Sequence, residues 1–313
     1  AEIHQNSSWS CVHGVERWRS DCGCKSRGDW HQKWRGPLRE ALDGLKAHLD
    51  HLFSTRGRVS FPDPWAARDA YIRVLLDRYS PKTTRAFLDE FAHPDLDQQQ
   101  TTDALRLLEA QLDSMLMYTS CGWFFDEISG LETTQCLQYA ARAIAMAGHF
   151  GRSLEGEFIE ALSKAPSSVP ADGDGRTVWE ECVRPAVVDL DRVLAHNAIT
   201  LIYQNGDHPR TDDDQAYEVA ASDVTIRGRG PGHLAIGRLV GRSKRTWRAA
   251  ESHFVVVHFG GLDFRTVLSR DIDAARFERF KADLLALYRS GSLADVLALV
   301  GRDFPGVEHR LDD

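Results

Sequence analysis

The sequence predicts an α+β fold, mainly a helical bundle with a small antiparallel β-meander insert. Leucines between Leu38 and Leu52 recur at three- and four-residue spacing, which is the period of one apolar helix face. Residues 216–268 instead alternate apolar and polar side chains and contain frequent glycines, a pattern typical of strands. Because the two patterns occupy different stretches of the chain, they favour an α+β arrangement.

Composition shifts along the chain predict four segments. A Pro/Gly/Ser/Asp-rich linker at 165–176 interrupts the helical part, and the period changes again near residue 201. The sheet is expected to have about four strands. The expected segments are a Cys/Trp-rich loop at 1–33, a helical bundle at 34–200, an antiparallel sheet at 201–270 and C-terminal helices at 271–313.

Helix starts are marked by capping residues followed by proline. Asp63 before Pro64 and Ser80 before Pro81 are typical N-caps, because proline fits the first helical position. The first of these helices is expected to run to about residue 78. The apolar spacing predicts further helices over about 97–120, 130–148 and 177–195.

Charge and composition exclude several classes of protein. The 313 residues carry a net charge of -8, which disfavours binding to a phosphate backbone. No apolar run approaches the ~20 residues that span a bilayer. No signal peptide opens the chain, and six cysteines are too few for a disulfide scaffold, so we expect a reducing cytoplasm. The chain starts without Met and a dense motif begins at about residue 8, so we expect a piece of a longer protein.

The first dense motif, WSCVHGVERWRSDCGC at 9–24, holds half of the cysteines. Cys11, His13, Cys22 and Cys24 are soft ligands that suit tetrahedral zinc. Each ligand pair is separated by one residue, however, where structural zinc sites usually have two to four. A disulfide from Cys11 to Cys22 or Cys24 is a second possibility. The simplest interpretation has reduced, packed cysteines and no cofactor, with zinc as the alternative.

The same motif is rich in aromatic and charged residues. Half of the eight tryptophans, namely Trp9, Trp18, Trp30 and Trp34, lie in or just after it. Aromatic faces stack on sugar rings, and Asp, Glu, Arg and His bind sugar hydroxyls, so the loop is a candidate carbohydrate wall. The alternative is a structural tryptophan cluster held by salt bridges.

A second motif, YTSCGWFFDEISGLETTQC at 118–136, breaks a helical period at a glycine. Trp123 and the two phenylalanines after it cannot all point inward on a short turn, so at least one is expected to be exposed or to line a cleft. Asp126 or Glu127 is a candidate substrate ligand or proton-transfer group. The alternative is capping of the next helix by Asp126 and Ser129, with Glu132 as the capping-box partner of Ser129.

Three stretches carry a resemblance to a known family. They are NSSWSCVHGVERWRSDCGC near the start, DPWAARDAYI at 63–72 and MLMYTSCGWFFDEISGLETTQCLQYAARAI at 115–144. Over nearly its whole length the chain resembles domain of unknown function 3536. That module occurs downstream of the catalytic barrel in bacterial proteins similar to glycoside hydrolase family 57.

The resemblance implies an accessory role in α-glucan processing by a retaining mechanism. In that family a Glu nucleophile and an Asp acid/base lie on an N-terminal barrel, and a helical domain adds aromatic and acidic residues to the sugar cleft. This chain lacks the alternating strand–helix pattern of such a barrel. We therefore expect no catalytic residue here, an inactive isolated chain, and two partners, an α-glucan or related carbohydrate and the parent's barrel.

The resemblance also implies which residues face the cleft, from HGVERWRSD at 13–21 and GWFFDE at 122–127. The expected substrate-binding residues are Trp9, His13, Arg17, Trp18, Asp21, Trp123, Asp126 and Glu127. Two other hypotheses stay open. One is a zinc-binding structural module that uses Cys11, His13, Cys22 and Cys24, and the other is an independent hydrolase that uses Asp21 and Asp126.

Overall fold

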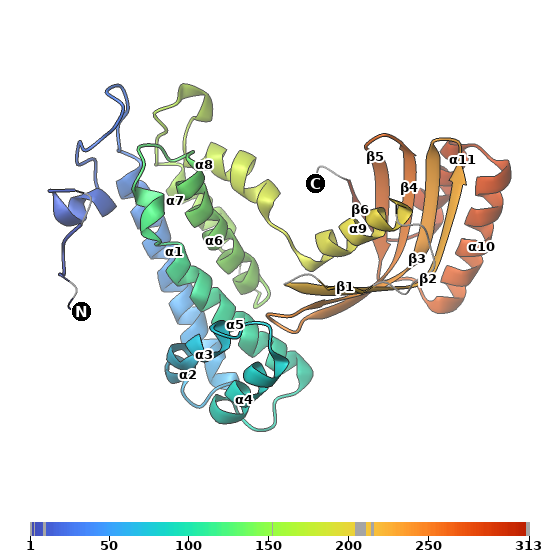
Figure 1. The fold of residues 1–313 in the computed structure, drawn as a ribbon, viewed down its shortest axis with the longest axis horizontal. Helices are drawn as coiled ribbons and strands as arrows, with labels where there is room; N and C mark the ends of the chain where they lie inside the picture. The colour runs from blue at the N-terminus through green and yellow to red at the C-terminus, as the bar shows by residue number, and fades with distance from the viewer. Residues whose placement is uncertain are drawn as a thin grey trace. The chain divides into compact units, whose positions relative to one another are not determined.

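A computed structural model describes residues 2, 4–8, 11–151, 153–203, 211–213 and 216–310. Trp9, one of the expected substrate-binding residues, lies outside the described residues. The chain divides into two compact units, Ala1–Val187 and Val188–Asp313. The first unit is helical and the second contains the sheet, which confirms the predicted α+β class (Figure 1).

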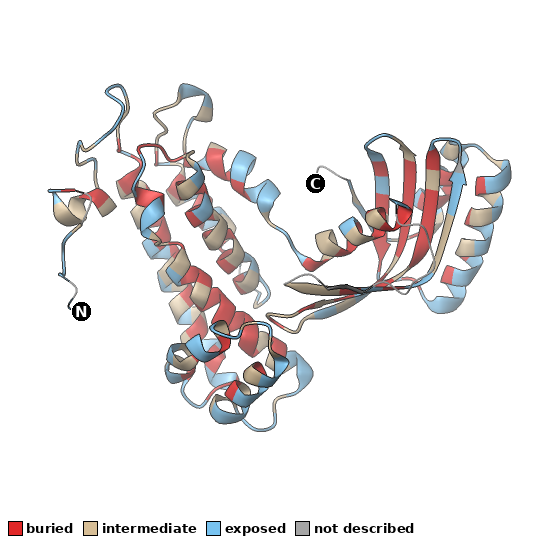
Figure 2. Cartoon of the chain, in the orientation of Figure 1, coloured by how far each residue is buried: buried red, intermediate tan, exposed pale blue. Residues whose placement is uncertain are grey.

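The first unit is built around one apolar core, to which α1, α6 and α7 contribute most of the helical residues. Leu38, Leu42 and Leu49 of α1 are almost completely buried, as the leucine spacing predicts, and they pack with residues of α6 and α7. Figure 2 shows the buried residues gathered on the inner faces of these helices. The helices of this unit are α1 Arg35–Arg56, α2 Pro64–Ala70, α3 Ile72–Leu75, α4 Pro81–Phe91, α5 Gln98–Leu116, α6 Leu131–Gly148, α7 Glu155–Leu162 and α8 Gly175–Val178.

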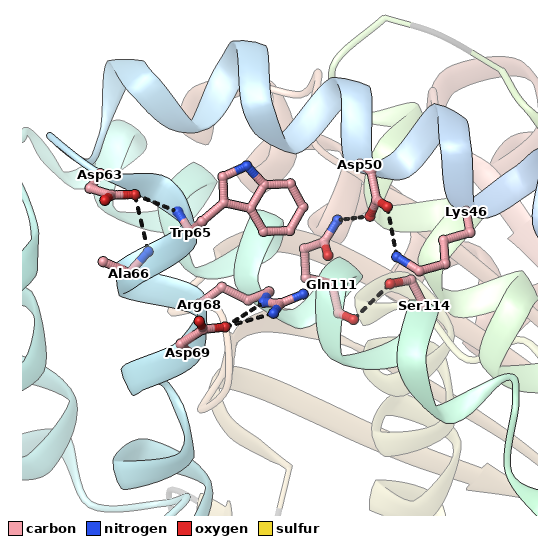
Figure 3. Close-up of polar contacts among 9 residues, drawn as sticks. All are labelled: Lys46, Asp50, Asp63, Trp65, Ala66, Arg68, Asp69, Gln111 and Ser114. Atoms are coloured by element: carbon pink, nitrogen blue, oxygen red, sulfur yellow. Dashed lines mark hydrogen bonds and ion pairs between the residues drawn. The ribbon is translucent and has the colours of Figure 1, made fainter. Parts of the chain in front are cut away.

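Side-chain caps fix the helix starts that the sequence predicts. The Asp63 carboxylate accepts hydrogen bonds from the backbone N–H groups of Trp65 and Ala66, both at 3.1 Å (Figure 3). Ser80 accepts one from Thr83, and Asp97 begins α5 with a full capping box. These contacts satisfy amide groups that have no partner within the helix.

A polar contact also joins α1 to α5. The Asp50 carboxylate accepts hydrogen bonds from Lys46, at 2.7 Å, and from the Gln111 amide, at 3.1 Å, as Figure 3 shows. Because Lys46 and Asp50 are four residues apart on one helix, they are already neighbours on its surface. The Gln111 amide extends this pair across to the second helix.

Three expected helices differ from the structure. The helix expected to run to residue 78 is divided into α2 and α3, with the buried Tyr71 between them donating its hydroxyl to Glu109 of α5. The helix expected over 97–120 ends at Leu116, before a 3-10 turn over Ser120–Trp123. The capping box expected between Ser129 and Glu132 is wrong, since the N-cap of α6 is Gly130 and makes no side-chain hydrogen bond.

The helix expected over 177–195 is wrong in its middle. After α8 the chain passes through a π-helical turn at Trp179–Val183 and a 3-10 turn at Arg184–Ala186. Pro185 accounts for the break, because proline lacks an amide hydrogen and disfavours helical torsions in the residue before it. A new helix, α9, starts at Leu190, capped by Asp189. The boundary between the two units falls in this gap.

The second unit is an antiparallel meander with helices on both faces. The six strands lie in the order β1-β2-β3-β4-β5-β6, so the expected strands gain two short neighbours. Alternate residues of β3 and β4 pack on α9 or on α10 and α11, which confirms the period-two pattern. The elements are α9 Leu190–Thr200, β1 Thr211–Asp213, β2 Tyr217–Arg229, β3 Gly232–Ser243, β4 Ala249–Gly260, β5 Asp263–Ser269, α10 Ala274–Ser290, α11 Leu293–Asp303 and β6 Val307–His309.

No helix in the described part of the chain combines the length and the apolar composition needed to cross a bilayer.

Candidate metal centre

Four ligand side chains of the N-terminal loop converge on one point. The Cys11 sulfur lies 3.7 Å from the Cys22 sulfur and 3.5 Å from the Cys24 sulfur. The His13 Nδ1 atom lies 3.4 Å from the Cys11 sulfur and 3.3 Å from the Cys24 sulfur. All four ligand atoms are within 4.8 Å of one another. The structure therefore brings together the residues of the zinc hypothesis.

Local backbone geometry makes the one-residue spacing workable. In an extended strand, residues two apart are separated by roughly 7 Å along the backbone, so a turn brings their ligand atoms closer together. Gly23, between Cys22 and Cys24, has a φ of 78°, a left-handed conformation that glycine adopts at little cost. Gly14, after His13, has a φ of 58° and opens a 3-10 turn over Gly14–Trp18. These turns replace the longer spacer that most structural zinc sites use.

The distances match the requirements of a tetrahedral zinc ion. With Zn–S bonds of about 2.3 Å and Zn–N bonds of about 2.0 Å, a tetrahedron places sulfurs about 3.8 Å apart and sulfur about 3.5 Å from nitrogen. The four separations given above lie within a few tenths of an ångström of these values, and the other two, from Cys22 to Cys24 and to His13, are at most 4.8 Å. A disulfide requires sulfurs at about 2.05 Å, and all six cysteines are free. Four protein ligands would close the coordination sphere, as in structural sites.

The cluster perturbs its own thiols. Burial raises the pKa of Cys11, but hydrogen bonds from the His13 backbone and ring and from the other two thiols outweigh it and lower that pKa to about 6. The contact with Cys11, together with burial and the neighbouring sulfurs, raises the pKa of Cys24 to about 11. One member of the cluster therefore ionises easily, and a metal cation is what allows the others to follow.

Two buried polar side chains support the cluster from the start of the helical bundle. The Arg35 guanidinium donates to the Cys22 sulfur at 3.7 Å and to the backbone carbonyl of Phe125 at 3.1 Å. The Gln32 amide donates to the backbone carbonyl of Cys24 and to the Asp126 carboxylate. Neither residue was expected from sequence. The sequence does indicate that Arg35 is buried, because it lies in phase with the buried leucines Leu38 and Leu42 of the same helix.

Asp126 ties the N-terminal loop to the turn before α6. One carboxylate oxygen accepts hydrogen bonds from the backbone N–H and the hydroxyl of Ser26 and from the backbone N–H of Arg27, and the other accepts from Gln32. The Trp34 indole donates to the Asp126 backbone carbonyl at 3.1 Å. Although burial raises the pKa of Asp126, these hydrogen bonds lower it below its usual range. Asp126 is thus a charged anchor within the protein.

Glu127 makes a similar anchor for a different segment. Its carboxylate accepts hydrogen bonds from the Ser167 hydroxyl at 2.7 Å and from the Ser168 backbone N–H at 2.8 Å. Ser168 in turn exchanges hydrogen bonds with the backbone of His31. The predicted linker at 165–176 is therefore pinned beside the N-terminal loop.

The remaining expected substrate-binding residues have different surroundings. Trp123 is 1% exposed and stacks on Trp34 in the core. Arg17 is buried, lies over the Phe124 ring and donates to the Phe124 carbonyl. Trp18 packs partly buried against the same core.

Two further members of that set lie at the surface. His13 and Asp21 are exposed, and the Asp21 carboxylate accepts a hydrogen bond from the Gln32 backbone. The two predicted loops are in direct contact through Arg17 and through Asp126. The side chains that they leave at the surface include Phe124 and Phe125, which are 37% and 48% exposed.

The fold and this site define a class of chain, a helical unit with a four-ligand Cys/His loop, followed by a sheet unit. A family model described as a domain of unknown function (DUF3536) matches residues 30–313. The chain belongs to this family. The match covers Gln32, Arg35, Asp126 and Glu127 and starts after the four Cys/His residues. Searches of curated proteins and of solved structures find no match.

Proposed function

We propose that the N-terminal part of this chain is a zinc-binding structural module. The observation that carries the proposal is the convergence of Cys11, His13, Cys22 and Cys24, whose ligand atoms all lie within 4.8 Å of one another. Three thiolates and an imidazole form a donor set that selects zinc over magnesium or calcium. The proposal includes a reducing compartment such as the bacterial cytoplasm, because the thiols bind the metal only while they are reduced.

The metal would act by cross-linking two turns of a loop that has little core of its own. Bound zinc would accept electron pairs from the three sulfurs and the imidazole, and these bonds would link the two turns. The chain's residues do the rest, since Cys11 and His13 present one turn and Cys22 and Cys24 the other. Asp126 and Gln32 then hold the folded loop against the helical unit. In structural zinc sites the binding free energy is itself folding free energy.

The test is metal content combined with thiol accessibility. We expect about one zinc per chain in protein purified without chelator. In the native protein the exposed thiols of Cys121 and Cys182 should react first, while Cys11, Cys22 and Cys24 should stay protected until a chelator is added. The variant Cys22→Ser should lose the metal, and the matched control Cys182→Ser should keep it. Protein that binds no zinc after reconstitution would overturn the proposal.

A second candidate function concerns the surface that this loop supports. The observation that favours it is the exposed pair Phe124 and Phe125, whose rings pack edge to face with centroids 5.1 Å apart. An exposed aromatic pair beside the Arg17 guanidinium is suited to sugar stacking. We propose that the chain is an accessory domain of a protein similar to glycoside hydrolase family 57, whose catalytic pair lies on a barrel elsewhere in the parent.

Within this second proposal the buried residues change roles. Trp123, Asp126 and Glu127 hold the loops, while Phe124, Phe125 and the half-buried Trp18 offer surface to an α-glucan. The independent-hydrolase alternative gains no support, because Asp126 is buried and kept charged by its hydrogen bonds.

The second function is tested by glucan binding to the parent protein. Phe124→Ala and Phe125→Ala should each weaken binding, because stacking of this kind contributes about 1 kcal/mol. The exposed Leu131 is the control, and Leu131→Ala should leave the affinity unchanged. Equal affinity in all three variants would remove the aromatic pair from the sugar surface.

A further inference from the structure

Arg35 is a buried cation without a conventional counter-ion. The residue is 0% exposed at the start of α1. In the described part of the chain, its guanidinium hydrogen-bonds the Cys22 sulfur and the Phe125 carbonyl and forms no ion pair with a carboxylate. Its Nε atom is buried without a hydrogen-bond partner among the described residues. Asp126, the acidic group near it, directs its oxygens to Ser26, Arg27 and Gln32.

This arrangement is costly if the cysteines are neutral thiols. A buried charge is tolerated when it is paired, and burial of an unpaired charge costs several kcal/mol. A neutral Cys22 thiol, a carbonyl group and the Trp34 ring, whose centroid lies 5.3 Å from the guanidinium carbon, supply partial charges only. Because Arg35, unlike the buried Arg17, donates to a sulfur that can ionise, its position points to a formal negative charge at or beside the Cys22 sulfur in the functional state.

We propose that Arg35 is the counter-cation of the metal centre and positions the Cys22 thiolate. The inference rests on the proposed zinc site and deepens it. A zinc ion with three thiolates and a neutral imidazole has a net charge of about −1. One buried guanidinium brings the sum to zero. Its N–H group also withdraws electron density from the Cys22 sulfur, which lowers the reactivity of that thiolate.

Arg17 offers a matched control. It is also a buried arginine, and it donates to the carbonyl of Phe124, the residue directly before the one that Arg35 contacts. Its contacts with the Phe124 carbonyl and with the Phe124 ring involve no sulfur. A loss of packing or of a carbonyl contact should therefore affect Arg17 and Arg35 variants alike, whereas charge compensation at Cys22 should affect Arg35 variants alone.

The first experiment measures zinc affinity of the full chain by competition with a chromophoric chelator. We expect Arg35→Met to weaken zinc binding about 10- to 100-fold, the range for lost partners of metal ligands. Arg35→Lys keeps the charge and should recover most of the affinity. Arg17→Met should stay close to wild type. Equal affinity in wild type and Arg35→Met would overturn the inference, and so would equal losses in Arg35→Met, Arg35→Lys and Arg17→Met.

The second experiment asks whether Arg35 acts through Cys22. With cobalt in place of zinc, Arg35→Met should move the sulfur-to-metal charge-transfer band to longer wavelength, because the sulfur loses a hydrogen bond. Arg17→Met should leave the band where it is in wild type. An unmoved band in Arg35→Met, or an equal shift in Arg17→Met, would make Arg35 merely structural.

The two proposals fail in different ways. Wild-type protein that binds neither zinc nor cobalt would overturn the metal site and the role of Arg35 together. Wild-type protein that binds zinc, with an Arg35→Met variant of equal affinity and unchanged cobalt spectrum, would overturn the role of Arg35 and leave the metal site standing.

Discussion

The N-terminal loop and the central sheet are held by opposite means. In the loop, residues 11–33, the buried side chains are those of Cys11, Arg17 and Gln32, a thiol, a cation and an amide. In the sheet, Leu234 and Ile236 belong to the apolar layer on one face, and Ala235 and Phe254 belong to the layer on the other. A segment with so few fully buried apolar side chains gains little from the hydrophobic effect. The loop must therefore be stabilised by specific bonds, and the proposed metal centre would be the strongest of them.

Removal of the metal by a chelator should produce the largest difference in stability between the loop and the sheet. Structural zinc contributes about 10 kcal/mol or more to peptides that need it for folding. Removal of the metal should therefore abolish amide protection across residues 11–33 and leave the sheet strands protected, as read by hydrogen exchange with mass spectrometry. If the loop keeps its protection after chelation, its own polar contacts are sufficient and the metal is dispensable for its structure.

A cavity in the sheet unit tests the opposite dependence, that of the loop on the sheet. Phe254 of β4 is 0% exposed and packs between α9 and the strands beside it. Phe254→Ala should destabilise the second unit by about 3–5 kcal/mol, because the cavity adds to the lost burial. The measurement is hydrogen exchange of strands β3 and β4 together with zinc content. The zinc content should not change, and a parallel loss of metal would show that the two regions depend on each other.

The structure of the sheet could be predicted from the sequence better than that of the N-terminal loop. The sheet and the long helices follow from period-two and leucine spacing, and the caps at Asp63 and Ser80 follow from local chemistry alone. The metal cluster was one alternative among three, because ligands one residue apart do not indicate convergence until the turns at Gly14 and Gly23 are known. The backbone torsions of these glycines are a property of the folded loop.

The long-range anchors could not be predicted for a different reason. Asp126 contacts Ser26, a hundred residues earlier in the chain, and no local pattern specifies such a pair. The sequence leaves Asp126 as a candidate substrate ligand or, alternatively, a helix cap, whereas in the structure its carboxylate accepts hydrogen bonds from Ser26, Arg27 and Gln32. The three consecutive aromatics at 123–125 predict that at least one of them is exposed or lines a cleft, but not which one. The turn settles this by burying Trp123 and leaving Phe124 and Phe125 partly exposed.

Asp126→Asn tests the carboxylate anchor. Asparagine keeps the size but places an NH₂ group among the donors of Ser26, Arg27 and Gln32. We expect a loss of about 2–3 kcal/mol in the stability of the first unit, the cost of buried donors left without an acceptor. Asp69, an exposed partner of Arg68, supplies the control (Figure 3). A similar effect of Asp69→Asn would mean that charge alone, without burial, explains the loss.

The Asp126 carboxylate also makes the stability of the folded protein depend on pH in the acid range. The pKa of Asp126 is lowered in the folded protein, whereas an unfolded aspartate titrates near ~3.9. Below that value the unfolded chain binds the extra proton first, so stability falls as the pH drops through the folded pKa. The stabilisation is fully present above about pH 5. Urea midpoints between pH 5 and pH 2 should fall more steeply for wild type than for Asp126→Asn, and equal slopes would exclude this carboxylate.

The smallest expected effect separates local from long-range stabilisation within the helical unit. Asp63 caps α2 through two backbone N–H groups at 3.1 Å, all within three residues of sequence. Asp63→Ala should cost about 1 kcal/mol, the usual contribution of an N-cap, and Asp63→Ser should recover most of it. Because the cap lies far along the chain from Cys11 and Cys24, the variant should bind zinc with wild-type affinity. A loss of zinc affinity in Asp63→Ala would mean that the metal senses the stability of the whole helical unit, and the loop would then no longer count as an independently bonded segment.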